Sequence, residues 1–237
     1  LQAQVALLSP HYYDITCPCA LPIIRAEMHL ALLKEPRMAA SLLRLHFHDC
    51  FVQGCDASLL LDDTPTFQGE KTANANINSA RGFRVIDIIK SKLESECPGV
   101  VSCADIITVA ARDAVLLSEG PYWEVSLGRK DSKTASFSDA NNNIPTPNSN
   151  LETLIASFQR QGLSITDMVA LFGGHTIGNA RCTNIRPRIY NQSAVSGMGF
   201  PEPHLSLVKA ACPPRGSDNG MWPLDFPTPV LFDNSYY

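Results

Sequence analysis

Residues 44–55 read RLHFHDCFVQGC, and this stretch decides the fold and the chemistry that we expect. Arg44 and His48 are four residues apart in a segment with helical spacing, so both side chains project from one face, while His46 points elsewhere. Imidazole moves protons near neutral pH, and guanidinium is a permanent cation that stabilises developing negative charge. Together they suit heterolytic cleavage of an O–O bond. The same pair alone is also typical of a solvated helix surface.

The loop that follows His48 is rich in oxygen atoms that suit a hard cation. Calcium takes carboxylate, hydroxyl and backbone carbonyl oxygens. Gly54 permits a tight turn, and a disulfide between Cys50 and Cys55 could close the loop and hold the end of the helix rigid. The side chains that supply oxygen are Asp49, Asp56, Ser58 and Glu70. A plain acidic loop is the alternative interpretation.

A second histidine, His175, is the best candidate for a metal ligand. Two-electron cleavage of a peroxide needs an electron source, so we expect a redox cofactor. A haem iron needs an axial ligand, and His175 follows Gly173 and Gly174, which let the backbone approach a flat macrocycle. The alternative is a helix-terminal histidine that interacts with the last carbonyls.

Helical periodicity dominates the rest of the chain. A capping pattern starts at Ser102, another starts at Ser164, and Asn150 is a candidate N-cap. The predicted helices cover residues 23–34, 38–51, 85–93, 103–117, 151–161, 165–172 and 180–190. Residues 123–127 alternate as a short strand would, residues 141–148 are loop chemistry, and residues 193–237 contain no long periodic segment. The sequence therefore predicts a mainly α protein, in two helical halves.

Composition narrows the class of protein further. The chain has 237 residues and a net charge of −4, which does not favour nucleic acid, and no apolar run approaches the roughly 18 residues of a membrane span. Eight dispersed cysteines predict long-range disulfides and an oxidising compartment, with buried free thiols as the alternative. Asn191-Gln192-Ser193 is a glycosylation sequon, and Leu1 to Gln4 could be the tail of a signal peptide.

These residues together resemble the class III secretory plant peroxidases, the horseradish peroxidase type. Residues 44–61, RLHFHDCFVQGCDASLLL, are similar to the distal haem motif of that family, and residues 173–182, GGHTIGNARC, to its proximal motif. FRVIDIIK, CPGVVSCADII and GRKDS between them also match family segments. The resemblance implies an all-α, two-domain helical fold with little β structure. Haem would lie between a distal half, residues 1–147, and a proximal half, residues 148–237.

The resemblance also implies roles for single residues. His48 would be the distal acid–base catalyst, Arg44 its cationic partner, and Asn76 the residue that orients His48. His175 would be the haem iron ligand, and Pro145 would lie near the exposed haem edge where small aromatic donors bind. The implied residues of the distal calcium site are Asp49, Val52, Gly54, Asp56, Ser58 and Glu70. The implied ligands of a proximal calcium ion are Thr176, Asp225, Thr228, Leu231 and Asp233.

Cysteine pairing and the end of the chain complete what the resemblance implies. The implied disulfides are Cys17–Cys97, Cys50–Cys55 and Cys182–Cys212, which leaves Cys19 and Cys103 over. The family continues past Tyr237 with an Asp that supports the ligand histidine and a Cys that pairs with Cys103. We therefore expect a C-terminally truncated member. Phe172 stands where the family usually has a small polar residue, and we expect it to crowd the proximal pocket.

The expected function is reduction of hydrogen peroxide coupled to oxidation of small phenolic donors. The expected cofactors are one haem b and two calcium ions, in a secreted monomer of the cell wall that binds neither nucleic acid nor membrane, with the vacuole as the alternative location. One competing function is a haem- and calcium-binding protein without effective turnover. Others are a thiol peroxidase that uses Cys19 or Cys103, and a disulfide-rich structural protein.

Overall fold

The computed structural model describes residues 8–191 and 204–237. Leu1 to Gln4 and the last two residues of the sequon lie outside the described residues. Helices dominate, as the sequence predicts. In chain order the elements are α1 (Ala20–Lys34), α2 (Met38–Cys50), η1 (Ser58–Leu60), α3 (Phe83–Glu96), α4 (Cys103–Leu117), α5 (Phe137–Asn143), α6 (Leu151–Arg160), α7 (Ile165–Phe172), η2 (Gly173–Thr176), β1 (Asn179–Arg181), α8 (Cys182–Ile189), α10 (His204–Ala211) and β2 (Met221–Pro223).

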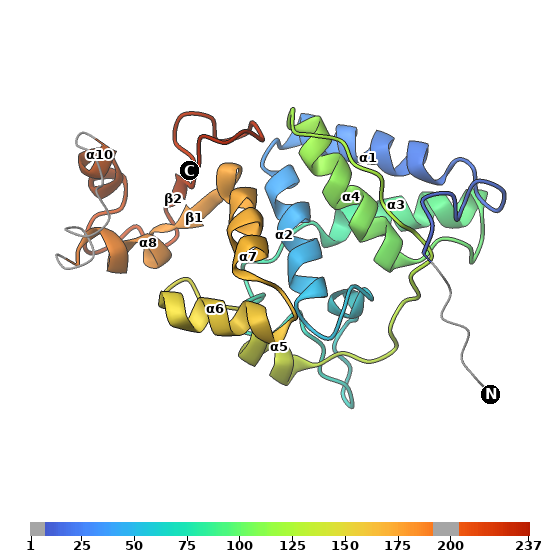
Figure 1. Cartoon of the computed structure of the whole chain (residues 1–237), viewed down its shortest axis with the longest axis horizontal. Helices are drawn as coiled ribbons and strands as arrows, with labels where there is room; N and C mark the ends of the chain where they lie inside the picture. The colour runs from blue at the N-terminus through green and yellow to red at the C-terminus, as the bar shows by residue number, and fades with distance from the viewer. Residues whose placement is uncertain (1–7, 192–203) are drawn as a thin grey trace.

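Helix α2 lies in the middle of the molecule, with α1, α3 and α4 on one side of it and α5, α6 and α7 on the other (Figure 1). Leu42 and Leu45 of α2 are buried in the main hydrophobic core together with side chains from α1, α3 and α4. Helix α4 is buried along most of its length, from Ala104 to Val115. The helix that carries the candidate acid–base residues is therefore held by apolar packing, the dominant stabilising term in folding.

A second core cluster joins the C-terminal end of α2 to the helices of the other side. Phe51 and Val52, directly after α2, pack in it with Phe158 of α6 and Met168 of α7. The ring centroids of Phe51 and Phe158 lie 5.1 Å apart with an edge-on geometry that aromatic pairs favour. The end of α2 is therefore fixed from both sides.

A third cluster lies at the end of the molecule where α8, α10 and the two strands meet (Figure 1). The disulfide Cys182–Cys212 ties the start of α8 to the residue after α10. Strands β1 and β2 pair antiparallel, with Asn179 opposite Pro223. This pairing brings residues 221–223 beside the segment that follows His175 along the chain.

The structure differs from the sequence-based expectation in a few elements. Residues 123–127 form no strand, only an isolated bridge between Leu127 and Ser9. Helix α8 begins at Cys182 rather than at residue 180, because residues 179–181 pair with β2. The sequence does not predict α5, whose last three residues belong to the segment 141–148 expected to be a loop, or α10, which lies where no long periodic segment was expected. Ser164 forms the predicted capping box with Asp167 at the start of α7. At the start of α4 the Ser102 hydroxyl accepts the amide of Asp105, but the Asp105 carboxylate accepts from Tyr13, so the box is not completed.

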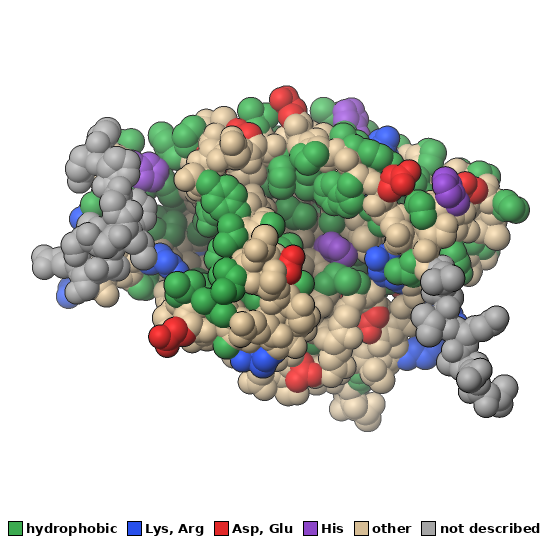
Figure 2. Space-filling view, viewed as in Figure 1, with side chains coloured by type: hydrophobic (Ala, Val, Ile, Leu, Met, Phe, Trp, Pro, Cys, Tyr) green, Lys and Arg blue, Asp and Glu red, His purple; other side chains and the backbone are tan. Residues whose placement is uncertain are grey.

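Helix α7 presents an apolar face outward. On the face of the molecule in Figure 2, hydrophobic side chains gather over this helix. Ile165, Val169 and Leu171 are 52%, 46% and 45% exposed. Within the described residues, no helix combines the length and the apolar character that a membrane span requires.

Candidate active site

Arg44 and His48 meet on one face of α2, as their spacing predicts. The Nε–H of Arg44 donates to Nε2 of His48 over 3.1 Å. His48 is buried, with 6% of its surface exposed, whereas Arg44 remains exposed. A guanidinium that donates to Nε2 requires a lone pair there, so the contact identifies Nε2 as the unprotonated nitrogen of the ring.

Asn76 holds the other nitrogen of the same ring. Nδ1 of His48 lies 2.6 Å from Oδ1 of Asn76, and Nδ2 of Asn76 donates to the carbonyl oxygen of Glu70 over 2.9 Å. The contact with Glu70 fixes which end of the amide faces His48, because only the NH₂ group can donate to a carbonyl. Nδ1–H therefore donates to Asn76, and Nε2 is the unprotonated nitrogen, which can accept a proton.

Burial and charge keep the imidazole of His48 neutral. The pKa of His48 is lowered to about 3, first because burial penalises the charged form and second because the Arg44 cation lies close by; the hydrogen bond with Asn76 acts in the opposite direction. A neutral imidazole with an unprotonated Nε2 is a base that can take a proton from a substrate which replaces the contact with Arg44.

The guanidinium of Arg44 is anchored by backbone oxygens from the loop before α3. Nη2 donates to the carbonyl of Ala75 over 2.8 Å, and Nη1 donates to the carbonyl of Ser79 over 2.9 Å. Nη2 also donates to the hydroxyl of Ser79 over 3.1 Å. Sequence reasoning missed Ala75 and Ser79, because a backbone acceptor leaves no signal in residue type. These contacts use the planar fork of arginine, which lysine lacks.

His175 lies in η2, directly after α7. The pKa of His175 is lowered, mainly because surrounding protein disfavours the charged ring and in part because of the charge of Arg44; a backbone hydrogen bond with Phe172 opposes the shift. The side chain of His175 is nevertheless exposed, so protein atoms lie around the ring while solvent can still reach it. The aromatic rings of Phe172 and Tyr236 lie 6.1 Å and 5.7 Å from its ring.

The ring of His175 has the properties expected of a ligand to haem iron. Within the described part of the chain, its ring has no side-chain hydrogen-bond partner. A neutral, open imidazole is a common metal ligand, and aromatic neighbours suit a flat macrocycle. Phe172 also contacts Phe158 edge-on at 5.9 Å, so it belongs to the second core cluster as well as to the surroundings of His175.

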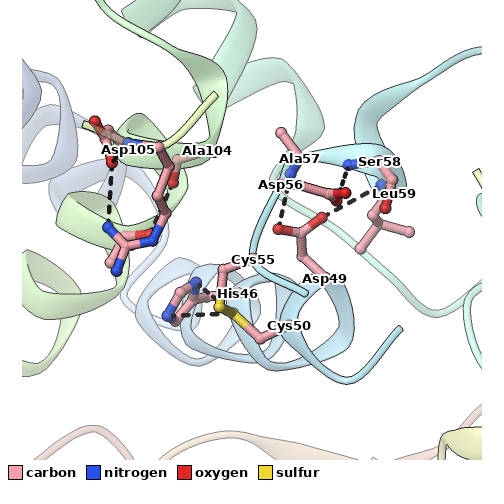
Figure 3. Close-up of a disulfide and its surroundings, with 12 residues drawn as sticks. His46, Asp49, Cys50, Cys55, Asp56, Ala57, Ser58, Leu59, Ala104 and Asp105 are labelled. Atoms are coloured by element: carbon pink, nitrogen blue, oxygen red, sulfur yellow. Dashed lines mark hydrogen bonds and ion pairs between the residues drawn. A yellow bond between two sulfur atoms is a disulfide. The ribbon is translucent and has the colours of Figure 1, made fainter. Parts of the chain in front are cut away.

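The predicted residues of the distal calcium site gather in the loop after α2 (Figure 3). Asp49 is buried, and its two carboxylate oxygens accept the amides of Ala57 over 3.0 Å and Leu59 over 3.4 Å. The Asp56 carboxylate accepts the amide of Ser58 over 3.1 Å. Val52 is buried and Gly54 has a φ of 123°, which favours glycine. Glu70 reaches this side of the molecule and accepts the amide of Ser136 over 3.1 Å.

The chemistry of this distal set fits a hard cation. The pKa of Asp49 is raised to about 7, mainly because the carboxylate is buried and in part because of the nearby charges of Asp56 and Glu70, while the hydrogen bonds from the amides of Ala57 and Leu59 oppose the shift. Burial likewise raises the pKa of Glu70. The hydroxyl oxygen of Ser58 and one carboxylate oxygen of Glu70 are buried without a hydrogen-bond partner. Unpaired buried oxygens and crowded carboxylates are costly unless a cation binds them.

The predicted proximal ligands also come together, from segments far apart in the chain. The Thr176 hydroxyl lies 2.9 Å from the Asp225 carboxylate and 3.2 Å from the Asp233 carboxylate. The Thr228 hydroxyl lies 3.4 Å from Asp225, and Leu231 follows in the same loop. One oxygen of Asp225 is buried without a hydrogen-bond partner. This oxygen-rich set, in which Thr176 directly follows His175 in the sequence, also fits calcium.

Similarity to known proteins identifies the family to which this chain belongs. The family model described as Peroxidase matches residues 24–237. The chain belongs to the peroxidase family. It is 54% identical to Peroxidase 9 of Arabidopsis thaliana, over 97% of this chain and 67% of the relative. It is 57% identical to Peroxidase 4 of Vitis vinifera, over 98% and 71%. It is 54% identical to Peroxidase RIP1 of Medicago truncatula, over 98% and 70%.

These relatives confirm the resemblance to the plant class III peroxidases. The chain is therefore an enzyme of the peroxidase type, which reduces hydrogen peroxide. Membership of this family generally implies haem, and the arrangement of His175 described above fits that cofactor.

The disulfides of this peroxidase are those that the resemblance implies. Cys17–Cys97, Cys50–Cys55 and Cys182–Cys212 are bonded, and Cys19 and Cys103 are free. Burial raises the pKa of the Cys103 thiol to about 11, with a further contribution from Asp131. A thiol of high pKa is a poor nucleophile at neutral pH, which weighs against Cys103 in a thiol peroxidase.

His46 lies against the Cys50–Cys55 disulfide (Figure 3). Its Nδ1 is 3.5 Å from Sγ of Cys50. The i, i+4 spacing on α2 is a signal in the sequence that predicts this contact. Burial lowers the pKa of His46 to about 4, with a contribution from the positive charge of Arg129. Pro145 follows α5 at the end of the second core cluster, beside the buried Ile144.

Proposed function

We propose that this chain is a haem peroxidase in which Arg44, His48 and Asn76 move and stabilise the charges that arise when hydrogen peroxide is cleaved, with small phenols as the reducing donors. The observation that carries the proposal is the hydrogen-bonded series of these three residues, in which Nε2 of His48 is an acceptor. The hydrogen bond from Nδ1–H to Asn76 is sufficient to leave Nε2 unprotonated.

The proton transfers follow from the tautomer of His48. Nε2 takes the proton from one oxygen of hydrogen peroxide and returns it to the other oxygen, which leaves as water. Arg44 stabilises the negative charge that grows on the departing oxygen. Asn76 keeps Nδ1 protonated and the ring in place, so that Nε2 remains the base throughout.

A bound haem would supply the redox-active iron that peroxide reduction requires. His175 would hold that iron, and the positive charge of Arg44 lowers the pKa of both His48 and His175. This assignment rests on the open, neutral ring of His175 and on its aromatic neighbours. The two imidazoles would then belong to a distal half, residues 1–147, and a proximal half, residues 148–237.

We propose a calcium ion in each half. The distal ion would use the oxygen set around Asp49, and the proximal ion the set around Asp225. Support comes from the unpaired buried oxygens of Ser58, Glu70 and Asp225. The distal ion would also support catalysis, because Glu70 accepts from Asn76 through its backbone and lies in that oxygen set through its side chain.

Donor and location complete the proposal. Small phenols would bind near Pro145, and lignin precursors and related plant phenols belong to this substrate class. The three disulfides support secretion, because such bonds persist in oxidising compartments. We propose a secreted, glycosylated monomer of the cell wall, with the vacuole as the alternative destination.

The test is peroxide-dependent oxidation of a simple phenol by the haem-loaded full chain. We expect turnover that requires peroxide and haem and that is lost in His48→Ala. The His48→Ala variant should still bind haem, because His175 is unchanged. A wild-type chain that bound haem without turnover would support the alternative, a haem- and calcium-binding protein without effective catalysis.

A further inference from the structure

Three sulfur atoms meet where the N-terminal segment, the start of α1 and the end of α3 converge. Cys17 and Cys97 form a disulfide, and Cys19 is a free thiol. Sγ of Cys19 lies 3.8 Å from Sγ of Cys17 and 3.8 Å from Sγ of Cys97. All three atoms lie within 4.8 Å of one another. A free thiol is therefore held against both sulfurs of a structural disulfide.

We propose that Cys19 is a second bonding partner of Cys97, so that this crosslink exchanges between Cys17–Cys97 and Cys19–Cys97. The Cys19 thiolate attacks Sγ of Cys97 and forms the new S–S bond. The bond between Cys97 and Cys17 breaks, and Cys17 leaves as a thiolate that takes up a proton. One disulfide and one thiol are present before and after, so the step needs no oxidant or reductant.

Attack on Cys97 is favoured over attack on Cys17. Bonding to Cys17 would close a bridge across Cys17-Pro18-Cys19, where two cysteines separated by a single proline cannot easily adopt disulfide geometry. Exchange also requires the incoming sulfur to line up with the bond that breaks. Since its distances to both sulfurs are equal, Cys19 now lies beside that bond. Rotation of the Cys19 side chain about Cα–Cβ is the movement that brings it into line.

The two crosslinks constrain the chain almost equally. Cys17 and Cys97 are 80 residues apart in sequence, and Cys19 and Cys97 are 78 apart. The entropy of closing a loop depends on the logarithm of its length, so this difference is negligible. Cys19 is the N-cap of α1 and Cys97 is the C-cap of α3. The exchanged bond therefore still ties the start of α1 to the end of α3.

The N-terminal segment does not depend on the crosslink at Cys17 alone. Ser9 and Leu127 exchange backbone hydrogen bonds of 2.9 Å in each direction. The hydroxyl of Tyr13 donates to the buried carboxylate of Asp105 over 2.7 Å, and the amide of Cys17 donates to the carbonyl of Tyr13 over 2.9 Å. These contacts hold residues 9–17 in place while the bond moves by two positions.

Exchange changes which thiol solvent can reach. Cys19 is half-buried, whereas Cys17 is 0% exposed. In the Cys17–Cys97 form the free thiol is therefore accessible, and in the Cys19–Cys97 form it is hidden. The exchange forms a switch between a reactive and a protected thiol, without any change in the number of disulfides.

The test is disulfide mapping by mass spectrometry of the full chain with the Cys17→Ser substitution, digested without reduction. We expect a peptide that links Cys19 to Cys97, and its loss in the double variant Cys17→Ser/Cys19→Ser. Cys55→Ser is the matched control, because no third sulfur lies within reach of Cys50 in the described residues, so Cys50 should remain a free thiol. Free Cys19 and Cys97 in a folded Cys17→Ser variant would overturn the proposal.

A second measurement uses the wild-type chain and does not depend on whether a variant folds. The oxidised chain is incubated at mildly alkaline pH, quenched with an excess of alkylating reagent under denaturing conditions, and mapped. We expect the label on both Cys17 and Cys19 across the population. In Cys19→Ser, Cys17 should carry no label. Label on Cys19 alone in the wild type would overturn the proposal.

Discussion

Nδ1 of His48 lies 2.6 Å from Oδ1 of Asn76, while the Nε–H of Arg44 donates to Nε2 of the same ring. One imidazole is thus bound at both nitrogens, by an acceptor on one side and a donor on the other. This arrangement fixes the tautomer before any substrate arrives. Peroxide then has to replace only the contact with Arg44 to reach the base.

Replacing Asn76 by Val tests the role of the amide. The variant has an apolar side chain that can neither accept from Nδ1–H nor donate to the Glu70 carbonyl, so the ring loses its fixed tautomer and orientation. We expect the bimolecular rate of reaction with peroxide to fall by about 10- to 100-fold, the range found when partners that orient a functional histidine are removed. The measurement is stopped-flow absorbance of the haem-loaded chain. Asn74→Val is the matched control: Asn74 is exposed in the same loop, so its rate should stay within twofold of wild type. Equal losses in the two variants would contradict the role of Asn76.

Two substitutions of Arg44 separate the effect of its positive charge from the effect of its planar shape. Arg44→Leu removes the cation that stabilises the departing oxygen, and we expect the peroxide reaction to slow by about 10²- to 10³-fold. Arg44→Lys keeps the charge but loses the fork that contacts Ala75 and Ser79, so its rate should fall between wild type and Arg44→Leu. Single-turnover kinetics at fixed peroxide checks the order. A lysine variant as slow as the leucine variant would mean that charge alone contributes little.

The pH dependence of the peroxide reaction reports the pKa of His48. That pKa is lowered to about 3, so Nε2 remains unprotonated as pH falls through the usual range of histidine, and the rate should decline only near pH 3. Arg44→Leu removes one cause of the lowering, so the acid limb should move to higher pH. The measurement is a pH–rate profile over the range in which the fold survives. An acid limb near pH 6.5 in the wild type would contradict the environment described for His48.

Calcium should stabilise the fold through the proximal oxygen set. Binding to the native state alone adds about 2.7 kcal/mol when the ion is at a hundredfold excess over its Kd. We expect a chelator to lower the Tm of the wild type, and Asp225→Asn to lower both the calcium content and the response to the chelator. Thermal melts and elemental analysis of the dialysed protein measure these effects. Asp218→Asn, at an exposed carboxylate outside both sets, is the control and should respond as wild type does. An unchanged calcium content in Asp225→Asn would refute the proximal assignment.

Gly82 links the packing of α2 to the start of α3. It is the N-cap of α3 with a φ of 101°, and a Cβ there would lie 2.7 Å from Cδ2 of Leu42. Gly99 also has a positive φ, of 71°, but a Cβ there would meet nothing within 4 Å. Both alanine variants bear backbone strain, and only Gly82→Ala adds overpacking. We expect Gly82→Ala to lower the free energy of unfolding by about 1 to 3 kcal/mol more than Gly99→Ala, measured by urea denaturation. Equal losses would show that Leu42 yields without cost.

Patterns that span only a few residues account for most of what could be predicted from the sequence. The spacing of Arg44 and His48 placed both on one face of α2, and Ser164 with Asp167 predicted the start of α7, because these interactions span a few residues. The roles expected for Asn76, His175 and the two oxygen sets came from the family resemblance rather than from a local pattern.

Features that depend on distant partners could not be predicted in this way. Strand β1 exists because β2 pairs with it, and its own three residues have no strand character. The carbonyls of Ala75 and Ser79 hold Arg44, yet any residue type provides a carbonyl. The position of Cys19 between Cys17 and Cys97 depends on how α1 and α3 pack, which no spacing in the sequence reveals.

The most direct test of the central claim is the bimolecular rate of hydrogen peroxide with the haem-loaded chain, compared between wild type and His48→Ala at equal haem content. Loss of the base should slow this step by about 10²- to 10⁴-fold, the usual contribution of general acid–base catalysis. The slow variant should retain the wild-type Tm and haem spectrum. A His48→Ala chain that reacted with peroxide as fast as the wild type would contradict the account.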